Sequence, residues 1–147
     1  MNDIEFKKII DDAKASKPVW FELSQENDRT SLKEIGEIEC NIGIEYPEEY
    51  RMFISEYGAG VFAFTNVYSP KREGEWSSWV EKEKCSLPKE FIPISDNGCG
   101  DYIGFVVNDG KCSEGLYFSD HDENYKLDKE MKYESFYEFV IKSGLNT

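Results

Sequence analysis

Residues Gly43–Gly60 read GIEYPEEYRMFISEYGAG, and this stretch carries a start signal, a buried face and a stop signal for one helix. Pro47 suits the first helical position, because its φ is already helical and its missing N–H is not needed there. Gly58 suits the stop, because a left-handed backbone costs glycine nothing. Between them, bulky apolar residues recur at the i, i+3, i+4 and i+7 spacing of one helical face: Tyr50, Phe53, Ile54 and Tyr57. The sequence therefore predicts that this helix lies in the core and organises the fold.

Two helices are expected on the N-terminal side of this stretch. Ser31 and Glu34 form an S-x-x-E capping box for a helix that Gly43 closes. The apolar face of that helix is Leu32, Ile35, Ile38 and Ile42. Further upstream, Asp3 is expected to cap a first helix that Pro18 stops. The apolar face of the first helix is Ile4 or Phe6, with Ile9, Ile10 and Ala13.

On the C-terminal side the composition changes to aromatic and β-branched runs separated by turns. We expect strands at Val61–Tyr68, Phe91–Ser95, Tyr102–Val107, Gly115–Ser119 and Tyr125–Leu127. Pro93 argues for an edge or end position of its strand, because proline cannot donate to a sheet ladder. Residues 108–111, Asn-Asp-Gly-Lys, predict a tight hairpin turn. A second capping box, Ser135 with Glu138, opens a final helix with Gly144 as its C-cap.

This order of elements predicts an α+β fold, in which helices cover one face of a mostly antiparallel sheet. A chain of 147 residues fits one domain, and we expect residues 1–147 to form it, with an N-terminal helix and loop in residues 1–30. No apolar run approaches the roughly 20 residues that cross a bilayer, and the N-terminus lacks the apolar region of a secretory signal. The expected location is therefore the cytoplasm.

The charge balance is strongly acidic, with 17 Lys and Arg against 30 Asp and Glu and a formal net charge of −13. Phosphate backbones attract cations, so direct binding to nucleic acid is disfavoured. Acidity can simply keep a protein soluble. It can also draw in a basic protein partner through long-range attraction.

Few residues have the chemistry that a catalytic centre needs. The single histidine, His121, lies between two aspartates, and its simplest interpretation is a solvated loop residue. The four cysteines form no C-x-x-C pair and are expected to be buried free thiols: Cys40, Cys85, Cys99 and Cys112. A zinc site would need Cys99, Cys112 and His121 to meet on neighbouring strands, and the close spacing of a zinc knuckle is absent. The sequence therefore indicates neither a cofactor nor a metal.

The candidate binding residues are acids and tryptophans in the connections. Five acids are expected to converge at one end of the meander: Asp96, Asp101, Asp120, Asp122 and Glu123. Such carboxylates are either a solvated rim or ligands for Ca²⁺ or Mg²⁺, although the EF-hand spacing is absent. Residues 76–84 fit a short helix or a loop, in which Trp76 and Trp79 follow Glu73 and Glu75 and share a face if the segment is helical. These tryptophans are either core residues or anchors for a protein partner.

Several of these pieces together resemble a known family. The run from Ile35 through Phe62, which contains PEEYRMFISEYGAGVF, resembles the opening of the SUKH superfamily of immunity proteins. Later pieces follow in the family's order and spacing: FIPIS at 91–95, the Gly100–Asp101 pair and YESFYEFV at 133–140. The resemblance covers about residues 31–143, and Tyr46 stands where members more often carry Leu.

This resemblance implies an α+β fold around a twisted, mostly antiparallel sheet. Bacterial members typically bind and neutralise a cognate toxin, often a nuclease or a nucleic-acid deaminase. Three hypotheses follow for this chain: an immunity protein with a basic toxin as its partner, a regulatory or scaffolding interaction module, and a small hydrolase or metal-dependent enzyme that uses the acidic rim. The oligomeric state is left open.

Overall fold

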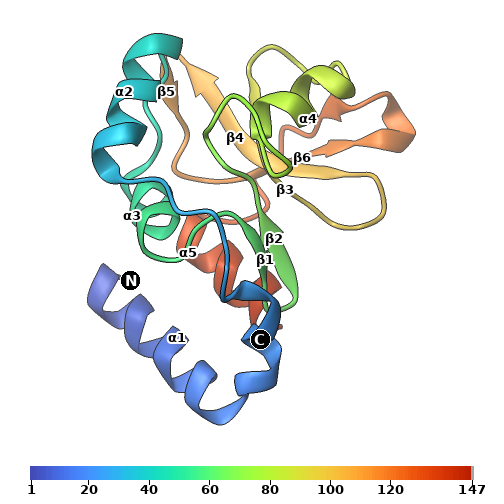
Figure 1. The fold of residues 1–147 in the computed structure, drawn as a ribbon. Helices are drawn as coiled ribbons and strands as arrows, with labels where there is room; N and C mark the ends of the chain where they lie inside the picture. The colour runs from blue at the N-terminus through green and yellow to red at the C-terminus, as the bar shows by residue number, and fades with distance from the viewer. Residues whose placement is uncertain (147) are drawn as a thin grey trace.

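The computed structural model describes residues 1–146, and helix α3 (Glu48–Glu56) lies in it between the second helix and the last one (Figure 1). Tyr50, Phe53 and Ile54 are fully buried and Tyr57 is half-buried, which confirms the predicted face. Gly58 adopts φ +86° just after the helix, as expected. The start differs by one residue: Pro47 is the N-cap, with an extended ψ of 148°, and its carbonyl accepts the first helical bond, from Arg51.

Helix α2 (Leu32–Ile42) precedes α3 and is joined to it by a short connection. Ser31 accepts a hydrogen bond from the Glu34 backbone N–H, and Gly43 takes φ +70°, so both end signals are confirmed. The predicted apolar face is only partly correct, since Ile35 is buried but Leu32 is 50% exposed. The helix is therefore held mainly through Ile35, and Ile38 and Ile42 are half-buried.

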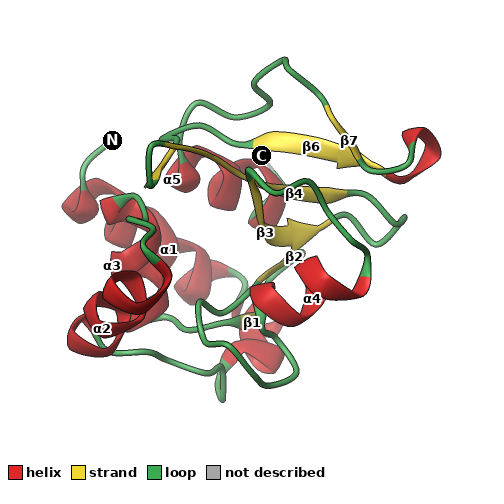
Figure 2. Cartoon of the chain, turned by 90° about the horizontal axis from the view of Figure 1, so that it is seen from above, coloured by secondary structure: helices red, strands yellow, loops and turns green. Residues whose placement is uncertain are grey.

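The first helix, α1 (Asp3–Ser16), packs on the core through one aromatic and one aliphatic side chain, its two buried residues. Phe6 stacks on Tyr137 with ring centroids 3.9 Å apart, and Ile10 is buried. Asn2, not Asp3, is the N-cap, because it is the Asn2 side chain that accepts from the Glu5 N–H. A 3-10 segment (Pro18–Ser24) follows, and in Figures 1 and 2 α1 lies away from α4.

The sheet is antiparallel, with the strand order β3–β4–β6–β7: β3 (Phe91–Asp96), β4 (Tyr102–Asn108), β6 (Tyr117–Asp120) and β7 (Lys126–Leu127). The short β5 (Lys111–Cys112) pairs with the end of β4 across the predicted turn, where Asp109 and Gly110 both have positive φ. Pro93 lies on β3, the edge strand, next to a bulge, as its missing donor requires.

Residues 61–68 do not form the single strand that their composition predicts. They form a separate two-stranded hairpin, β1 (Gly60–Phe62) and β2 (Thr65–Val67). Its turn contains Ala63 at φ +50°, and the Phe64 N–H donates to the Gly144 carbonyl oxygen over 2.9 Å. A tertiary hydrogen bond therefore holds a turn for which the sequence has no glycine or asparagine signal.

The helices cover both faces of the sheet, rather than the one face that we expected. Neighbouring residues of a strand point to opposite faces. Ile103 and Phe105 of β4 belong to the main core, which also contains the aromatic face of α3. Tyr102 lies in a second apolar cluster with Phe91, and its hydroxyl donates to Glu81 of α4 (Ser78–Lys84). Figure 2 shows α4 beside β3, on the other side from α1, α2 and α3.

The last helix, α5 (Phe136–Phe139), begins at Ser135 as predicted and continues as a π-helical turn, Val140–Gly144. Gly144 is the final residue of that turn and not its C-cap, which is Leu145; Asn146 takes the left-handed backbone, at φ +56°. None of the helices within residues 1–146 is long and apolar enough to span a membrane. The predicted α+β class is confirmed.

Candidate functional site

Two acidic loops lie side by side where β4 begins and β6 ends, because Tyr102 and Ser119 are paired across these strands. The His121 imidazole joins the loops. Its Nδ1 lies 2.7 Å from Asp101 Oδ1, and its Nε2 lies 3.1 Å from Asp122 Oδ1. The His121 backbone N–H also donates to Asp101 Oδ1 over 3.0 Å. We call Asp101, Asp120, Asp122 and His121 the acidic cluster.

The protonation of this cluster follows from its geometry. Both ring nitrogens face carboxylate oxygens, which accept hydrogen bonds, so the imidazolium with two N–H groups fits best. The hydrogen bond to Asp101 raises the pKa of His121 above its ordinary value, and the same bond lowers the pKa of Asp101 to about 2. His121 is therefore a paired residue that holds two loops together, and not simply the solvated side chain that we expected.

Gly100 makes this pairing possible. A Cβ at Gly100 would lie 3.1 Å from His121 Cγ, and the φ of +98° strains any other residue. The Gly100–Asp101 pair, which forms part of the family resemblance, thus has a local role: the glycine leaves room for the ring that the aspartate binds.

A metal ion is a weaker match to this cluster than a cationic side chain. One atom each from Asp101, Asp120 and His121 lie within 4.8 Å of one another. Only two of the five predicted acids take part, and Ca²⁺ and Mg²⁺ prefer oxygen ligands alone. The group is also partly exposed. A cation of either kind would have to compete with the existing bond between His121 and Asp101.

Asp96 does not belong to the acidic cluster, contrary to the predicted convergence. Its Oδ2 accepts from the Tyr68 hydroxyl and, over 3.3 Å, from Asn66 Nδ2. Its Oδ1 accepts from the Gly98 N–H over 2.9 Å. The carboxylate is therefore directed toward the β1–β2 hairpin.

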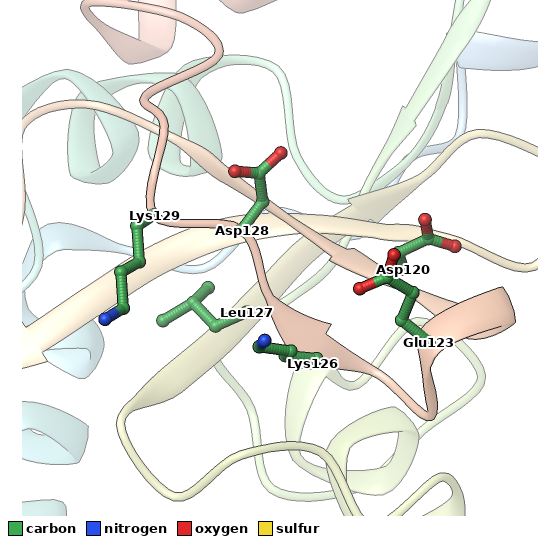
Figure 3. Close-up of a pocket in the computed structure, with 6 residues that line it drawn as sticks. All are labelled: Asp120, Glu123, Lys126, Leu127, Asp128 and Lys129. Atoms are coloured by element: carbon green, nitrogen blue, oxygen red, sulfur yellow. The ribbon is translucent and has the colours of Figure 1, made fainter.

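Glu123 and Asp120 line an open cavity of about 440 Å³ beside β7. Figure 3 shows their carboxylates at one end of this cavity and the Lys129 ammonium at the other. The remaining lining residues are Lys126, Leu127 and Asp128. Because both acids and lysines line the cavity, it presents charges of both signs to a ligand.

The tryptophan segment differs from its predicted form. Helix α4 begins at Ser78, so Trp76 precedes the Ser77 cap, and the two indoles do not share a helical face. Both are half-buried and pack against the core, while Glu73 and Glu75 are exposed on the preceding loop.

Trp79 has a polar environment of its own. The Arg72 guanidinium lies 5.3 Å from the centroid of the Trp79 ring, and the Nε1 of Trp79 is buried. Packing against the core therefore covers most of the surface of both tryptophans. Their role as anchors for a protein partner stays a prediction.

The cysteines only partly follow the expectation of buried thiols. Cys112 is buried, and burial raises the pKa of its thiol to about 12, while Cys85 is half-buried. Cys40 and Cys99 are exposed, so the expectation is wrong for these two. Among the described residues, no group that could hold a metal contains a cysteine.

Sequence reasoning missed a second cavity, which we call the hairpin groove. It has a volume of about 550 Å³ and lies between the β1–β2 hairpin, the β3–β4 turn, β6 and the π-helical turn. Its lining includes Phe64, Asp96, Ile103, Phe118, Tyr133 and Lys142. The reading of residues 61–68 as one strand hid this feature, because it placed no turn at Phe64.

Residues 32–140 match the model of the family SUKH_6, described as SMI1-KNR4 cell-wall. The chain belongs to this SUKH family. The match confirms the resemblance, and it runs from the start of α2 to the start of the π-helical turn. The SUKH match leaves α1 and the 3-10 segment outside, but it includes the acidic cluster and most of the hairpin groove. No curated protein matches the chain.

Proposed function

We propose that this SUKH chain is an immunity protein that binds and neutralises a basic toxin, most simply a nuclease, in the cytoplasm and without catalysis of its own. The observation that carries the proposal is the acidic cluster, in a chain with a net charge of −13. Family membership supports it, because bacterial members of the SUKH superfamily typically act in this way.

In this proposal, the acidic cluster attracts the toxin through its negative charge. A nuclease domain must attract phosphates and is therefore often basic. The three carboxylates of the cluster outnumber its one imidazolium, so a net negative charge remains. The Asp122 side chain is 80% exposed and that of Asp120 is 47% exposed, so this charge faces an approaching partner. Such a field speeds encounter with a basic surface and weakens as salt rises. An acidic protein seated in a phosphate-binding groove also blocks the substrate.

The cluster is fixed before a partner arrives. Asp101 accepts from Asn97 Nδ2 over 2.9 Å as well as from His121, and Asp120 accepts from the Asp122 N–H over 2.9 Å. Side chains that are already ordered lose less conformational entropy on binding. The proposed contact surface is therefore preorganised, although it lies on loops.

The test is a measurement of association and dissociation rates against candidate basic toxin domains, taken from the genes that flank this chain's gene, at low and at high salt. The cluster variant combines Asp120→Asn and Asp122→Asn, two acids of the cluster, with Glu123→Gln, an exposed acid next to them. It should slow association and largely spare dissociation, because exposed rim charges mainly tune the on-rate. The matched control removes the same three charges from exposed acids elsewhere: Asp11→Asn, Asp12→Asn and Glu22→Gln.

The control should slow association less than the cluster variant, because its charges lie on α1 and on the 3-10 segment. An association rate that is indifferent to salt and equal in both variants would refute attraction through the acidic cluster.

A further inference from the structure

The hairpin groove has an apolar floor that two neighbouring strands supply. Ile103 of β4 and Phe118 of β6 are cross-strand partners, and both line the groove. Tyr133 lines it as well, and its hydroxyl lies 3.0 Å from Ser143 Oγ on the π-helical turn. A volume of about 550 Å³ lies within the range of about 300–1,000 Å³ that is typical of ligand sites. The groove is therefore large enough to take a short peptide segment.

Phe64 stands at one edge of the groove as an exposed but fixed aromatic residue. Its ring is 59% exposed. Its backbone N–H is bonded to the Gly144 carbonyl, and its ring packs edge-on against Trp20 with centroids 4.9 Å apart. The positive φ of the preceding Ala63 is unfavourable for an L-residue, and the surrounding contacts maintain it. An exposed aromatic that is ordered in advance has the properties of a binding anchor.

The charge in the groove is not balanced. Its two charged lining residues are Asp96 and Lys142. The Lys142 ammonium is paired with Glu138 Oε1 at 2.7 Å, so its charge is compensated. Asp96 is half-buried and receives only neutral donors, from Tyr68, Asn66 and Gly98. Within residues 1–146, no cationic side chain pairs with Asp96. The groove therefore offers one carboxylate, that of Asp96, which is hydrogen-bonded but has no cationic partner, beside an aromatic floor.

The Phe118 ring already has a cationic partner within the chain. The Lys132 ammonium lies 5.1 Å from the ring centroid, within the range of cation–π attraction. The positive charge of a ligand would therefore pair with Asp96, and a neighbouring apolar group would contact Phe64.

We propose that the hairpin groove binds a short cationic segment of the partner protein. An apolar or aromatic side chain of that segment packs on Phe64 and Phe118, while a neighbouring Lys or Arg pairs with Asp96. This contact is separate from the acidic cluster, and it rests on the proposed function only in identifying the partner as a toxin. The acidic cluster speeds the encounter, and the groove sets how long the complex lasts.

The first experiment needs no toxin. The amide resonances of the full chain are followed by NMR during titration with the peptide acetyl-Lys-Trp-Lys-amide, and with acetyl-Glu-Trp-Glu-amide as its control. The lysine peptide should bind with a Kd of about 1 mM or tighter. It should shift the amides of Phe64, Asn66 and Ile103. Binding of the glutamate peptide with equal affinity, or shifts confined to residues 120–123, would overturn the proposal.

Two variants test the two halves of the contact. Phe64→Ala should weaken binding of the lysine peptide about tenfold, as expected for an anchor. Asp96→Asn should weaken the lysine peptide and reduce its advantage over the glutamate peptide. The controls are Ile4→Ala, which removes an 81% exposed apolar side chain on α1, and Asp12→Asn, which removes an exposed acid. A loss of affinity in the controls equal to that in Phe64→Ala would refute a site in the groove.

The second experiment uses the toxin domain from the neighbouring gene. Phe64→Ala should raise its dissociation rate about tenfold while leaving the association rate nearly unchanged. If the toxin binds wild type and Phe64→Ala with the same Kd, the groove proposal fails and the immunity function stands. If the toxin does not bind wild type but the lysine peptide binds in the groove, the immunity function fails and the groove stands.

Discussion

Phe53→Ala is the substitution that most directly tests the role of α3 in the core. The Phe53 side chain is 1% exposed. Four aromatic rings surround it, with centroids 5.0 to 6.3 Å away: Phe6, Tyr57, Phe62 and Phe136. Truncation of a buried Phe to Ala costs about 3–5 kcal/mol, and the ring contacts place this site in the upper part of that range, at about 4–5 kcal/mol. The rigid rings of its neighbours cannot easily close the cavity.

The assay is thermal unfolding followed by circular dichroism. For a chain of this size, 1 kcal/mol lowers Tm by about 2–4 °C, so Phe53→Ala should lower Tm by about 8–20 °C. Ile4→Ala, at the 81% exposed position on α1, is the control and should change stability by no more than about 0.5 kcal/mol. A Tm for Phe53→Ala that equals that of the control would refute the reasoning, because a buried ring in four aromatic contacts cannot be removed without cost.

Three further predictions concern local structure, pH and activity. Ser135 accepts the Glu138 N–H at the start of α5, so Ser135→Ala should lower the free energy of unfolding by about 1 kcal/mol in a urea titration. The raised pKa of His121 adds stability below the ordinary histidine pKa of about 6.5, and that contribution disappears as the pH rises through the raised value. The stability difference between wild type and His121→Phe should therefore shrink with rising pH, and a constant difference would contradict the pairing with Asp101. The purified protein should show no nuclease, peptidase or phosphatase activity, and an activity that His121→Ala abolishes would count against a pure binding role.

Local sequence signals were sufficient to predict most of the helix ends. Ser31, Ser135 and Gly43 act on backbone groups within three or four residues of themselves, so their effects can be predicted from the sequence. The turn at Asp109–Gly110 is of the same kind. In contrast, the starts of α3 and α1 were each predicted one residue away from their observed positions, because the N-cap and its neighbour share most of their residue preferences. Pro47 is the N-cap of α3 and not its first residue, and Asn2 is the N-cap of α1 in place of Asp3.

The candidate site depended on contacts that no local pattern encodes. Asp101 and His121 are 20 residues apart and meet only because of the register between β4 and β6. The turn at Phe64 is held by a hydrogen bond to Gly144, which is distant in the sequence. Residues 61–68 were therefore predicted as one strand from their composition alone. Asp96 was assigned to the acidic loops because it belongs to the same turn as Asp101, but its carboxylate is bound by Tyr68 and Asn66 from the hairpin.

The most direct test of the central claim is a growth measurement in cells that express the toxin domain encoded beside this chain's gene. Expression of the toxin domain alone should stop growth, and co-expression of this SUKH chain should restore it. Co-expression with an unrelated toxin should give no protection, because recognition rests on a specific surface. Cells that stop growing although both proteins are soluble and abundant would contradict the proposal that this chain is an immunity protein for that toxin.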